Sequence, residues 1–368
     1  MLTAARGTHG DEGVVEVSRR TTVWRAASTV LALACCLVAT ACQSSSGPTA
    51  TSGRVGVVLP LLSSPFWQAY NAAVLQQAKA QGVNVLPPVN SAGDTDKQIS
   101  DINKLLVEGA KGLIVAPLDS GAIRPGLSTA QREGVPVVAV DVAPLSGKAA
   151  MVIRADNRAY GQKACRHLGD AVKTGKVVQI QGDLASANGR DRSEAFSACM
   201  AKNYRGIKVL DIAADWRSDK AATGLETVYG INPDIKGIYL QAGGVYLRPA
   251  LTTLEHHHAL FPAGDPRHIV IFSNDGSPQE LDAIRSGEID ATVSQPVDLY
   301  AKYAISYITK AMAGHSFKPG PTNHGSTVVR LPSGLLEDRL PAPTVTRQNV
   351  DDKALWGNSI KASRRAAK

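Results

Sequence analysis

The sequence predicts an α/β protein that folds into two doubly wound, parallel-sheet lobes. From Gly53 onward, short apolar runs rich in Val and Ile alternate with helical patterns, and after Asp156-Asn157 the same alternation starts again. Continuous apolar runs are typical of strands buried on both faces, and their alternation with helices indicates a parallel sheet. The 368 residues also suffice for two lobes with a core each.

The first lobe is expected to begin with four strands joined by helices. The strands are expected at Val55–Leu59, Val83–Leu86, Gly112–Ala116 and Val135–Val140. The helices between them should end near Gln81, Glu108 and Arg132. Gly82 and Gly134 follow two of these helices, where a C-cap favours a residue that tolerates positive φ.

The second lobe repeats this pattern after a short strand at Met151–Ile153. Its strands are expected at Lys176–Ile180, Ile207–Ile212, Gly237–Leu240, Ile269–Phe272 and Ala291–Ser294, each followed by a helix. A last strand is expected at Thr327–Val329. Pro341 and Pro343 then oppose a helix, so residues 334–368 are expected to form an extended C-terminal tail.

Residues 1–41 are expected to be an export signal that ends at a lipidation site. A positively charged start at Ser18–Arg25 precedes an apolar stretch at 26–41 that is short for a membrane span. Cys42 then closes a segment that resembles a lipobox, and residues 42–53 form a Ser- and Thr-rich tether. We therefore expect a lipoprotein that is anchored to the outer face of the cell membrane or lies in the periplasm. An ordinary cleaved signal is the alternative, and the charged start also suggests twin-Arg export.

Charge and cysteine content narrow the class of protein. Of the net charge of +8, +7 lies beyond residue 41, where it is scattered with no basic run before Arg364-Arg365, so we expect no nucleic-acid partner. Of the five cysteines, only Cys165 and Cys199 lie beyond the leader and its lipidation site. In an exported protein they are either joined by a disulfide or present as two buried thiols, and the sequence leaves both alternatives open.

Aromatic and polar side chains gather where the expected strands end. Phe66 and Trp67 follow the first strand, and ligands of open α/β sheets bind outside the carboxyl ends of strands. The alternative for both rings is a hydrophobic plug on the next helix. The other residues at strand ends are Asp141, Asp183, Asp215, Trp216, Gln241, Asp275 and Gln295, with Arg190 and Arg192 after Gly189. A single Asp there is more often a helix N-cap, but the repetition favours one cleft that binds hydroxyl groups.

Motifs for catalysis and for cofactor binding are missing from the sequence. It contains no Gly-x-Ser-x-Gly, no Gly-x-Gly-x-x-Gly and no phosphate-binding loop, so we expect neither an enzyme nor a cofactor. His256-His257-His258 forms a run on a predicted helix, where adjacent side chains point about 100° apart and do not chelate as an i,i+4 pair does. We interpret the run as solvated surface and expect no metal site.

Several motifs, taken in order and spacing, resemble the ribose/galactose-type solute-binding proteins of bacterial ABC importers over about residues 54–332. They are Ser63-Ser64-Pro65-Phe66-Trp67, Ala116–Ser120, Pro136–Asp141, Ala155–Gly161, Gly189–Phe196, Asn274–Pro278 and Ala291–Pro296. The resemblance implies the type I periplasmic-binding-protein fold, in which a three-segment hinge joins two lobes. The N-terminal lobe would comprise residues 54–155 and 296–322, and the C-terminal lobe residues 156–295 and 323–333.

The resemblance also implies a function and a set of ligand-binding residues. A monomer would hold a sugar or sugar-like molecule between its lobes and deliver it to an ABC permease. Phe66, Trp67 and Trp216 would stack on the ligand. Polar contacts would come from Ser64, Asp141, Arg192, Gln241, Asp275 and Gln295. Ser64, Ala116, Val142 and Ala242-Gly243 stand where the family usually has other polar side chains, so we expect a ligand other than ribose held in the usual way.

Three rival functions remain for such a fold. A ligand sensor would signal occupancy to a membrane receptor instead of importing solute. A repressor would need a helix-turn-helix before Val55, where residues 1–53 resemble an export signal instead. A surface glycoside hydrolase would use the aspartates at strand ends, but no His or Cys nucleophile accompanies them there.

Overall fold

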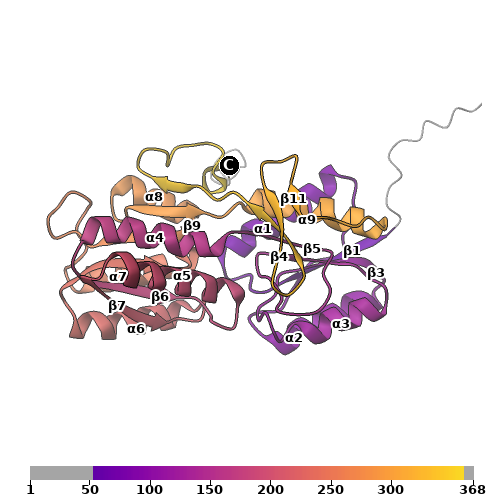
Figure 1. Ribbon diagram of the computed structural model, residues 1–368, viewed down its shortest axis with the longest axis horizontal. Coiled ribbons are helices and arrows are strands. Elements are labelled where there is room, and N and C mark those ends of the chain that lie inside the picture. The colour runs from indigo at the N-terminus through magenta and orange to yellow at the C-terminus, as the bar shows by residue number, and fades with distance from the viewer. Residues whose placement is uncertain (1–52, 360–368) are drawn as a thin grey trace, which may run out of the picture. The chain divides into compact units, whose positions relative to one another are not determined.

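The computed structural model describes residues 53–359 (Figure 1). The expected export signal at 1–41, Cys42 and the tether up to residue 52 lie outside the described residues, as do residues 360–368. Within the described range the strands form one sheet of eight strands and one of six. Both sheets are mostly parallel and carry helices, which confirms the predicted α/β class.

The first sheet has the strand order β11-β12-β13-β5-β4-β3-β1-β2. Its strands are β1 (Arg54–Leu59), β2 (Val89–Asn90), β3 (Ala110–Val115), β4 (Val137–Val140), β5 (Met151–Ala155), β11 (Gly320–Pro321), β12 (Thr327–Arg330) and β13 (Leu336–Leu340). The helices of this lobe are α1 (Pro65–Ala80), α2 (Thr95–Val107), α3 (Arg124–Arg132) and α9 (Val297–Met312). Only the pairings of β12 with β11 and β13 are antiparallel in this sheet.

The second sheet has the strand order β14-β10-β9-β8-β6-β7. Its strands are β6 (Gly175–Gln181), β7 (Ile207–Ala213), β8 (Ile235–Leu240), β9 (Val270–Asp275), β10 (Ala291–Ser294) and β14 (Thr344–Thr346). Its helices are α4 (Asn157–Val172), α5 (Ala187–Asn203), α6 (Ser218–Ile231), α7 (Gly243–His256) and α8 (Pro278–Ser286). Between residues 53 and 359, no helix is both long enough and apolar enough to cross a membrane.

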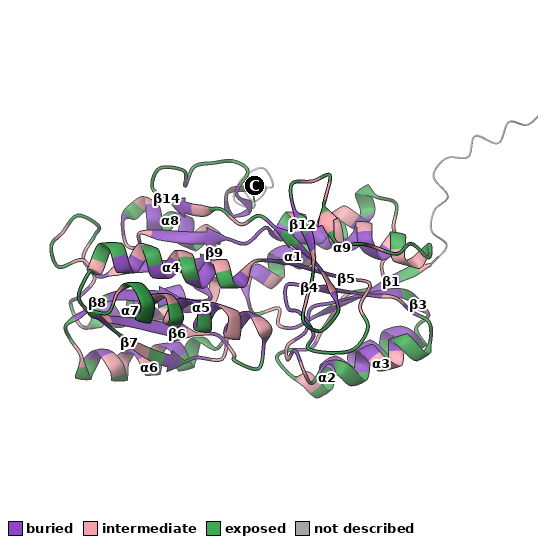
Figure 2. Ribbon diagram, in the orientation of Figure 1, coloured by how far each residue is buried: buried purple, intermediate pink, exposed green. Residues whose placement is uncertain are grey.

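Burial explains why the apolar runs became central strands. In β1, every residue from Val55 to Leu59 is buried, because β3 and β2 flank the strand and helices cover its faces. Figure 2 shows the central strands of both sheets as buried, whereas the helices alternate buried and exposed residues. This is the pattern of a parallel sheet covered on both faces.

Three chain crossings connect the two sheets. β5 leads into α4, β10 leads into α9, and β13 leads into β14 between Leu340 and Thr344. The prediction that residues 323–333 belong to the second lobe is wrong, because β12 lies in the first sheet. The third crossing therefore comes later in the chain than the sequence predicted.

The strand that precedes this crossing, β13, contains charged residues and therefore lacks the apolar pattern of a buried strand. β13 pairs in parallel with β5, from Glu337 opposite Val152 to Leu340 opposite Ala155. Glu337 is buried and lies 3.4 Å from Nη1 of Arg154, which comes from the neighbouring strand. The strand is thus held by a buried ion pair, and an apolar pattern alone does not predict it.

The expected extended tail at 334–368 is also corrected by the structure. β14 pairs in an antiparallel manner with β10 of the second sheet, and Val350, Leu355 and Trp356 beyond it are buried. Nε1 of Trp356 donates a hydrogen bond over 2.8 Å to the backbone oxygen of Asp275. Val350 and Leu355 are therefore part of the second lobe's core, whereas the ring of Trp356 also packs against Phe66 of α1.

The expected second strand at Val83–Leu86 is nearly absent. Val55 donates to the backbone oxygen of Asn84, and Leu86 donates to the backbone oxygen of Val55, so pairing with β1 begins there. Pro87 and Pro88 then follow, and proline has no N–H to continue a ladder. Regular pairing resumes only in the two residues of β2.

The helices α4 and α5 pack closely and are joined covalently. A Cβ on Gly161 of α4 would lie 2.3 Å from the backbone oxygen of Arg192 on α5, so only glycine allows this approach. Cys165 of α4 and Cys199 of α5 are bonded as a disulfide with an S–S distance of 2.01 Å. Of the two alternatives that the sequence left open, the structure has the disulfide.

Candidate ligand-binding site

A cavity of about 620 Å³ lies at the carboxyl ends of strands from both sheets. The loops that follow β1, β4, β7, β9 and β10 contribute to its wall. Most of the predicted ligand-binding residues line it, namely Ser64, Phe66, Trp67, Asp141, Arg192, Trp216, Asp275 and Gln295. A cavity of a few hundred Å³ with polar groups converging on it is typical of small-molecule sites.

Asp141, at the end of β4, places a carboxylate in the wall with one oxygen unsatisfied. Oδ2 accepts a hydrogen bond over 2.9 Å from Nδ2 of Asn188, whereas the buried Oδ1 has no protein partner. Burial raises the pKa of Asp141, and the positive charges of Arg192 and Arg154 oppose that rise. A carboxylate accepts hydrogen bonds, so Asp141 is suited to a hydroxyl donor of a ligand in the cavity.

Asn188 is a wall residue that the sequence analysis missed. It lies in the first turn of α5, is 2 % exposed, and links two charged groups. Its Nδ2 donates to Asp141, and its Oδ1 accepts over 2.8 Å from Nη2 of Arg154. An amide can do both at once, which a carboxylate or an ammonium group cannot. The only signal in the sequence is its position two residues before Arg190, at the start of a helix.

Arg192 brings a fixed positive charge to the cavity from α5. Its Nε donates over 2.7 Å to Oδ1 of Asn157, and its Nη1 donates to the backbone oxygen of Gln241. The guanidinium carbon lies 5.2 Å from the ring centre of Tyr160 and 5.6 Å from that of Trp216. The side chain is 2 % exposed, so its orientation is set before any ligand arrives.

Asp275, at the end of β9, is the second buried carboxylate of the wall. Oδ1 accepts over 2.8 Å from Nε2 of Gln295, and Oδ2 accepts over 2.9 Å from the backbone N–H of Gly244. Burial raises the pKa of Asp275 to about 6, although Arg192 opposes the rise. Gln295, which follows β10, thus orients an acceptor on the neighbouring strand.

The two aromatic residues after β1 differ in their surroundings. Phe66 is 3 % exposed and packs edge-to-face against Trp67, Tyr300 and Trp356, with ring centres 5.1, 6.3 and 6.2 Å away. Trp67 is only half-buried. The sequence left open whether Phe66 lines a ligand site or forms a hydrophobic plug on α1. In the structure it does both, because it lines the cavity and also anchors α1 in the core.

Trp216, after β7, supplies a half-buried ring from the second lobe. A Cβ on Gly182 would lie 1.8 Å from Cη2 of Trp216, so the ring needs the space that this glycine leaves. The backbone N–H of Trp216 donates over 2.8 Å to the hydroxyl of Tyr246, which in turn donates over 3.0 Å to the backbone oxygen of Gln181. The loop that carries the ring is thereby fixed to β6.

Backbone strain is concentrated in the cavity wall. Asp141, Asp215, Trp216 and Asp275 have φ values of 64°, 50°, 60° and 122°, a region that L residues with a bulky side chain rarely adopt. Such strain costs of order 1–3 kcal/mol per residue and gathers at binding sites, where the surrounding fold enforces it. The strand-end loops therefore hold these side chains in positions that relaxed loops would not provide.

The prediction for Gln241 is wrong. Its side chain is fully buried below the wall, where Oε1 accepts over 2.9 Å from the N–H of Gly182 and Nε2 donates to Gln179 and Ser193. It is absent from the cavity lining. Gln241 acts on the site through its backbone oxygen, which accepts from Arg192.

Other predicted polar positions complete the wall. Asp183 and Asp215 line the cavity, and Asp215 also forms an ion pair with Lys220. Val142 and Ala242, which stand where the resembling family has polar residues, line it as well. Within residues 53–359, the one cluster of three or more side chains spaced to bind a metal lies away from this cavity.

The two sheets and the cavity at their strand ends define a two-lobed ligand-binding protein. Residues 55–316 match the model of the periplasmic binding protein domain family. Since the match covers more than half of the chain, the protein belongs to the periplasmic binding protein domain family, whose members are binding proteins and not enzymes.

Individual proteins extend the comparison. The chain is 28% identical over 251 residues to the ribose import binding protein RbsB of Bacillus subtilis, covering 68% of this chain and 78% of that protein. It is 26% identical over 319 residues to the xylitol-binding protein of Mycolicibacterium smegmatis, covering 85% and 82%. A crystal structure of an ABC transporter solute binding protein from Mycobacterium smegmatis, with bound glycerol, superposes with a TM-score of 0.70 at 27% identity, covering 81% of this chain and 95% of that one.

Proposed function

We propose that this protein is an extracytoplasmic solute-binding protein that captures a sugar or sugar-like molecule and delivers it to an ABC permease. The observation that carries the proposal is the cavity wall, where the carboxylates of Asp141 and Asp275 lie together with the guanidinium group of Arg192. Hydroxyl groups of the ligand would hydrogen-bond to these side chains. Names of relatives support the ligand class, because they include a ribose import binding protein and a xylitol-binding protein.

The charged groups of the wall favour a ligand rich in hydroxyls. Asp141 and Asp275 accept hydrogen bonds, and Arg192 donates them, so one hydroxylated molecule can satisfy both kinds of group. A ligand that lacks a matching hydroxyl would leave a buried group unpaired, at roughly 1–3 kcal/mol for each. The rings of Trp67 and Trp216 would pack against the C–H face of a sugar ring.

The apolar part of the wall restricts the choice among such ligands. Val142 and Ala242 offer no hydrogen bond where the resembling solute-binding proteins usually have polar side chains. A ligand held here would be larger than ribose, carry fewer hydroxyls on that side, or be contacted there through water. We therefore propose that the ligand is a polyol or a modified sugar other than ribose.

Hinge closure is the proposed mechanism of capture. The three crossings between the sheets allow the lobes to rotate as units, and wall residues from both lobes would enclose the ligand on closure. The ligand shifts the hinge only by its differential affinity for the closed state. The closed monomer would then dock on the permease.

A lipid on Cys42 would keep the protein at the membrane surface. The export signal at 1–41 and the tether at 42–53 support this part of the proposal. Mass spectrometry of the mature protein tests it, and we expect a lipidated Cys42 as the first residue. An unmodified terminus at another residue would rule out the anchor.

A thermal-shift screen against pentoses, hexoses and polyols tests the ligand class. At least one of these compounds should raise the Tm, because a ligand that binds only the folded state stabilises it. The Asp141→Ala variant should lose most of that shift. If no compound of the panel binds, or if Asp141→Ala binds as well as the wild type, the proposed function is wrong.

A further inference from the structure

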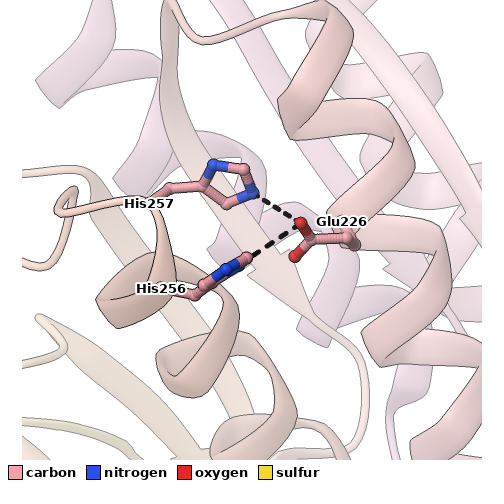
Figure 3. A group of neighbouring side chains, drawn as sticks. All are labelled: Glu226, His256 and His257. Atoms are coloured by element: carbon pink, nitrogen blue, oxygen red, sulfur yellow. Dashed lines mark hydrogen bonds and ion pairs between the residues drawn. The ribbon is translucent and has the colours of Figure 1, made fainter.

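A cluster of nitrogen and oxygen ligands lies on the second lobe, outside the wall of the ligand cavity. Glu226 comes from α6, whereas His256 and His257 come from the end of α7 (Figure 3). Oε1 of Glu226 lies 3.5 Å from Nδ1 of His256 and 2.8 Å from Nε2 of His257. One ligand atom from each residue lies within 4.8 Å of the other two.

The end of α7 explains how two consecutive histidines reach one carboxylate. His256 is the last helical residue, and His257 is the C-cap with φ −87° and ψ 9°. The chain then turns at His258, whose φ is 52°. Helical spacing therefore does not extend through the run, and both rings approach Glu226 from one side (Figure 3). The expectation of three helical histidines did not include a partner from another helix.

The packing of α6 against α7 holds part of this cluster in place. Glu226 and Tyr229 are three residues apart on α6 and therefore share a face of the helix. The ring of Tyr229 contacts that of His257, with 4.9 Å between ring centres. The side chain of His257 is 26% exposed, so its orientation is restricted by neighbours.

We propose that Glu226, His256 and His257 bind a divalent transition-metal ion, with Zn²⁺ as the best match. Imidazole nitrogens and a carboxylate oxygen are ordinary Zn²⁺ ligands, and water commonly takes the fourth position. Tetrahedral coordination with bonds of about 2.0–2.2 Å places the ligand atoms roughly 3.4 Å apart. Nδ1 of His256 lies 3.5 Å from Oε1 of Glu226 and already has that spacing. Nε2 of His257 lies 2.8 Å from the same oxygen, so these two atoms have to move slightly apart.

The proposed metal site lies at the protein surface. The side chains of His256 and Glu226 are 73% and 45% exposed, so the ion exchanges with solvent. It would connect the C-terminal end of α7 to α6 and stabilise the second lobe without entering the ligand cavity. This role does not depend on the proposed transport function.

Zn²⁺ titration of the chelator-treated, full-length protein by calorimetry tests the proposal. We expect one ion per chain and a higher Tm in its presence. His256→Ala and Glu226→Gln should each weaken Zn²⁺ binding at least tenfold. His257→Phe keeps a ring against Tyr229 but removes the ligand nitrogen, and should weaken binding equally.

His258→Ala is the matched control, because His258 is exposed, adjacent in sequence and outside the cluster. It should bind Zn²⁺ as the wild type does. Glu226→Gln is the decisive variant, since it leaves the histidine run intact. Wild-type affinity in Glu226→Gln would show that the run alone binds metal and would overturn the proposal, as would absence of Zn²⁺ binding by the wild type.

Discussion

Nδ2 of Asn188 donates a hydrogen bond over 2.9 Å to Oδ2 of Asp141, and so ties a helix of the second lobe to a strand end of the first. The same side chain accepts a hydrogen bond from Arg154 through its Oδ1 atom. This amide fixes the orientation of the Asp141 carboxylate in the cavity wall. Affinity should therefore depend on Asn188 as well as on Asp141.

Replacing Asn188 by alanine should weaken ligand binding more than tenfold. The variant leaves Asp141 and Arg154 each without one buried partner, so the free energy of unfolding should also fall by roughly 1–3 kcal/mol. Calorimetry and urea unfolding measure the two effects. Asn203→Ala, at the exposed end of the same helix, should change stability by less than about 0.5 kcal/mol. Equal behaviour of the two variants would contradict the role of Asn188.

Replacing Trp216 should mainly weaken ligand binding, whereas replacing Trp356 should lower the stability of the fold. Trp216→Ala removes a half-buried ring from the cavity wall and should weaken ligand binding well over tenfold, while circular dichroism shows a folded protein. Trp356→Ala removes a buried ring from the core and should lower the free energy of unfolding by roughly 3–5 kcal/mol. Unchanged affinity in Trp216→Ala would remove this ring from the site.

Asp275 should make the stability of the protein depend on pH. Its pKa is raised by burial from 3.8 to about 6, so between these values the folded state holds a proton that the unfolded state has lost. The contribution of this group is therefore complete below about pH 4 and is lost as the pH rises through 6, by roughly 3 kcal/mol for about two pKa units. Asp275→Asn has no proton to lose.

Urea unfolding of the wild type and of Asp275→Asn between pH 4 and pH 7 measures this difference. The wild type should lose stability relative to the variant as the pH rises. Glu280 adds to the fall in both proteins, because burial raises its pKa. In the wild type the charge of Asp275 raises it further, to about 7. If the difference in the free energy of unfolding between the two proteins stayed constant with pH, the raised pKa of Asp275 would be contradicted.

The disulfide should stabilise the second lobe. Cys165 and Cys199 are 34 residues apart, and closing a loop of this length contributes about 2–4 kcal/mol to the free energy of unfolding. The double variant Cys165→Ala/Cys199→Ala should lose about that much. Thiol titration of the denatured, unreduced wild type should detect neither cysteine. Detection of both would show that the bond is absent from the protein in solution.

The sequence predicted the parts of the fold that depend on apolar periodicity. Apolar runs mark β1, β3 and β4 and the strands β6 to β10 of the second sheet, and the ends of these strands carry most of the cavity wall. β13 escaped prediction because Glu337 and Asp338 are buried by pairing with Arg154 and Tyr307, which are far away in sequence. Long-range ion pairs and hydrogen bonds leave no periodic signal.

The residues of the ligand cavity, too, could be predicted only in part from the sequence. Asp141 and Asp275 could be predicted because strand ends converge, whereas Gln241 occupies such an end and yet turns its side chain toward Gly182 and Ser193. Position along a strand predicts the edge of the sheet that a residue reaches. The direction of its side chain depends on local packing, and in Asn188 it depends on two charges from the first lobe.

The central claim is that the carboxylate of Asp141 accepts a hydrogen bond from a hydroxyl of a small ligand enclosed by both lobes. A crystal structure of the protein with the compound that raises its Tm most tests this claim directly. We expect the ligand in the cavity, with a hydroxyl oxygen within hydrogen-bond distance of the Asp141 carboxylate and a ring or carbon face against Trp216. A ligand bound elsewhere on the protein, or one in the cavity that makes no hydrogen bond with this carboxylate, would contradict the account.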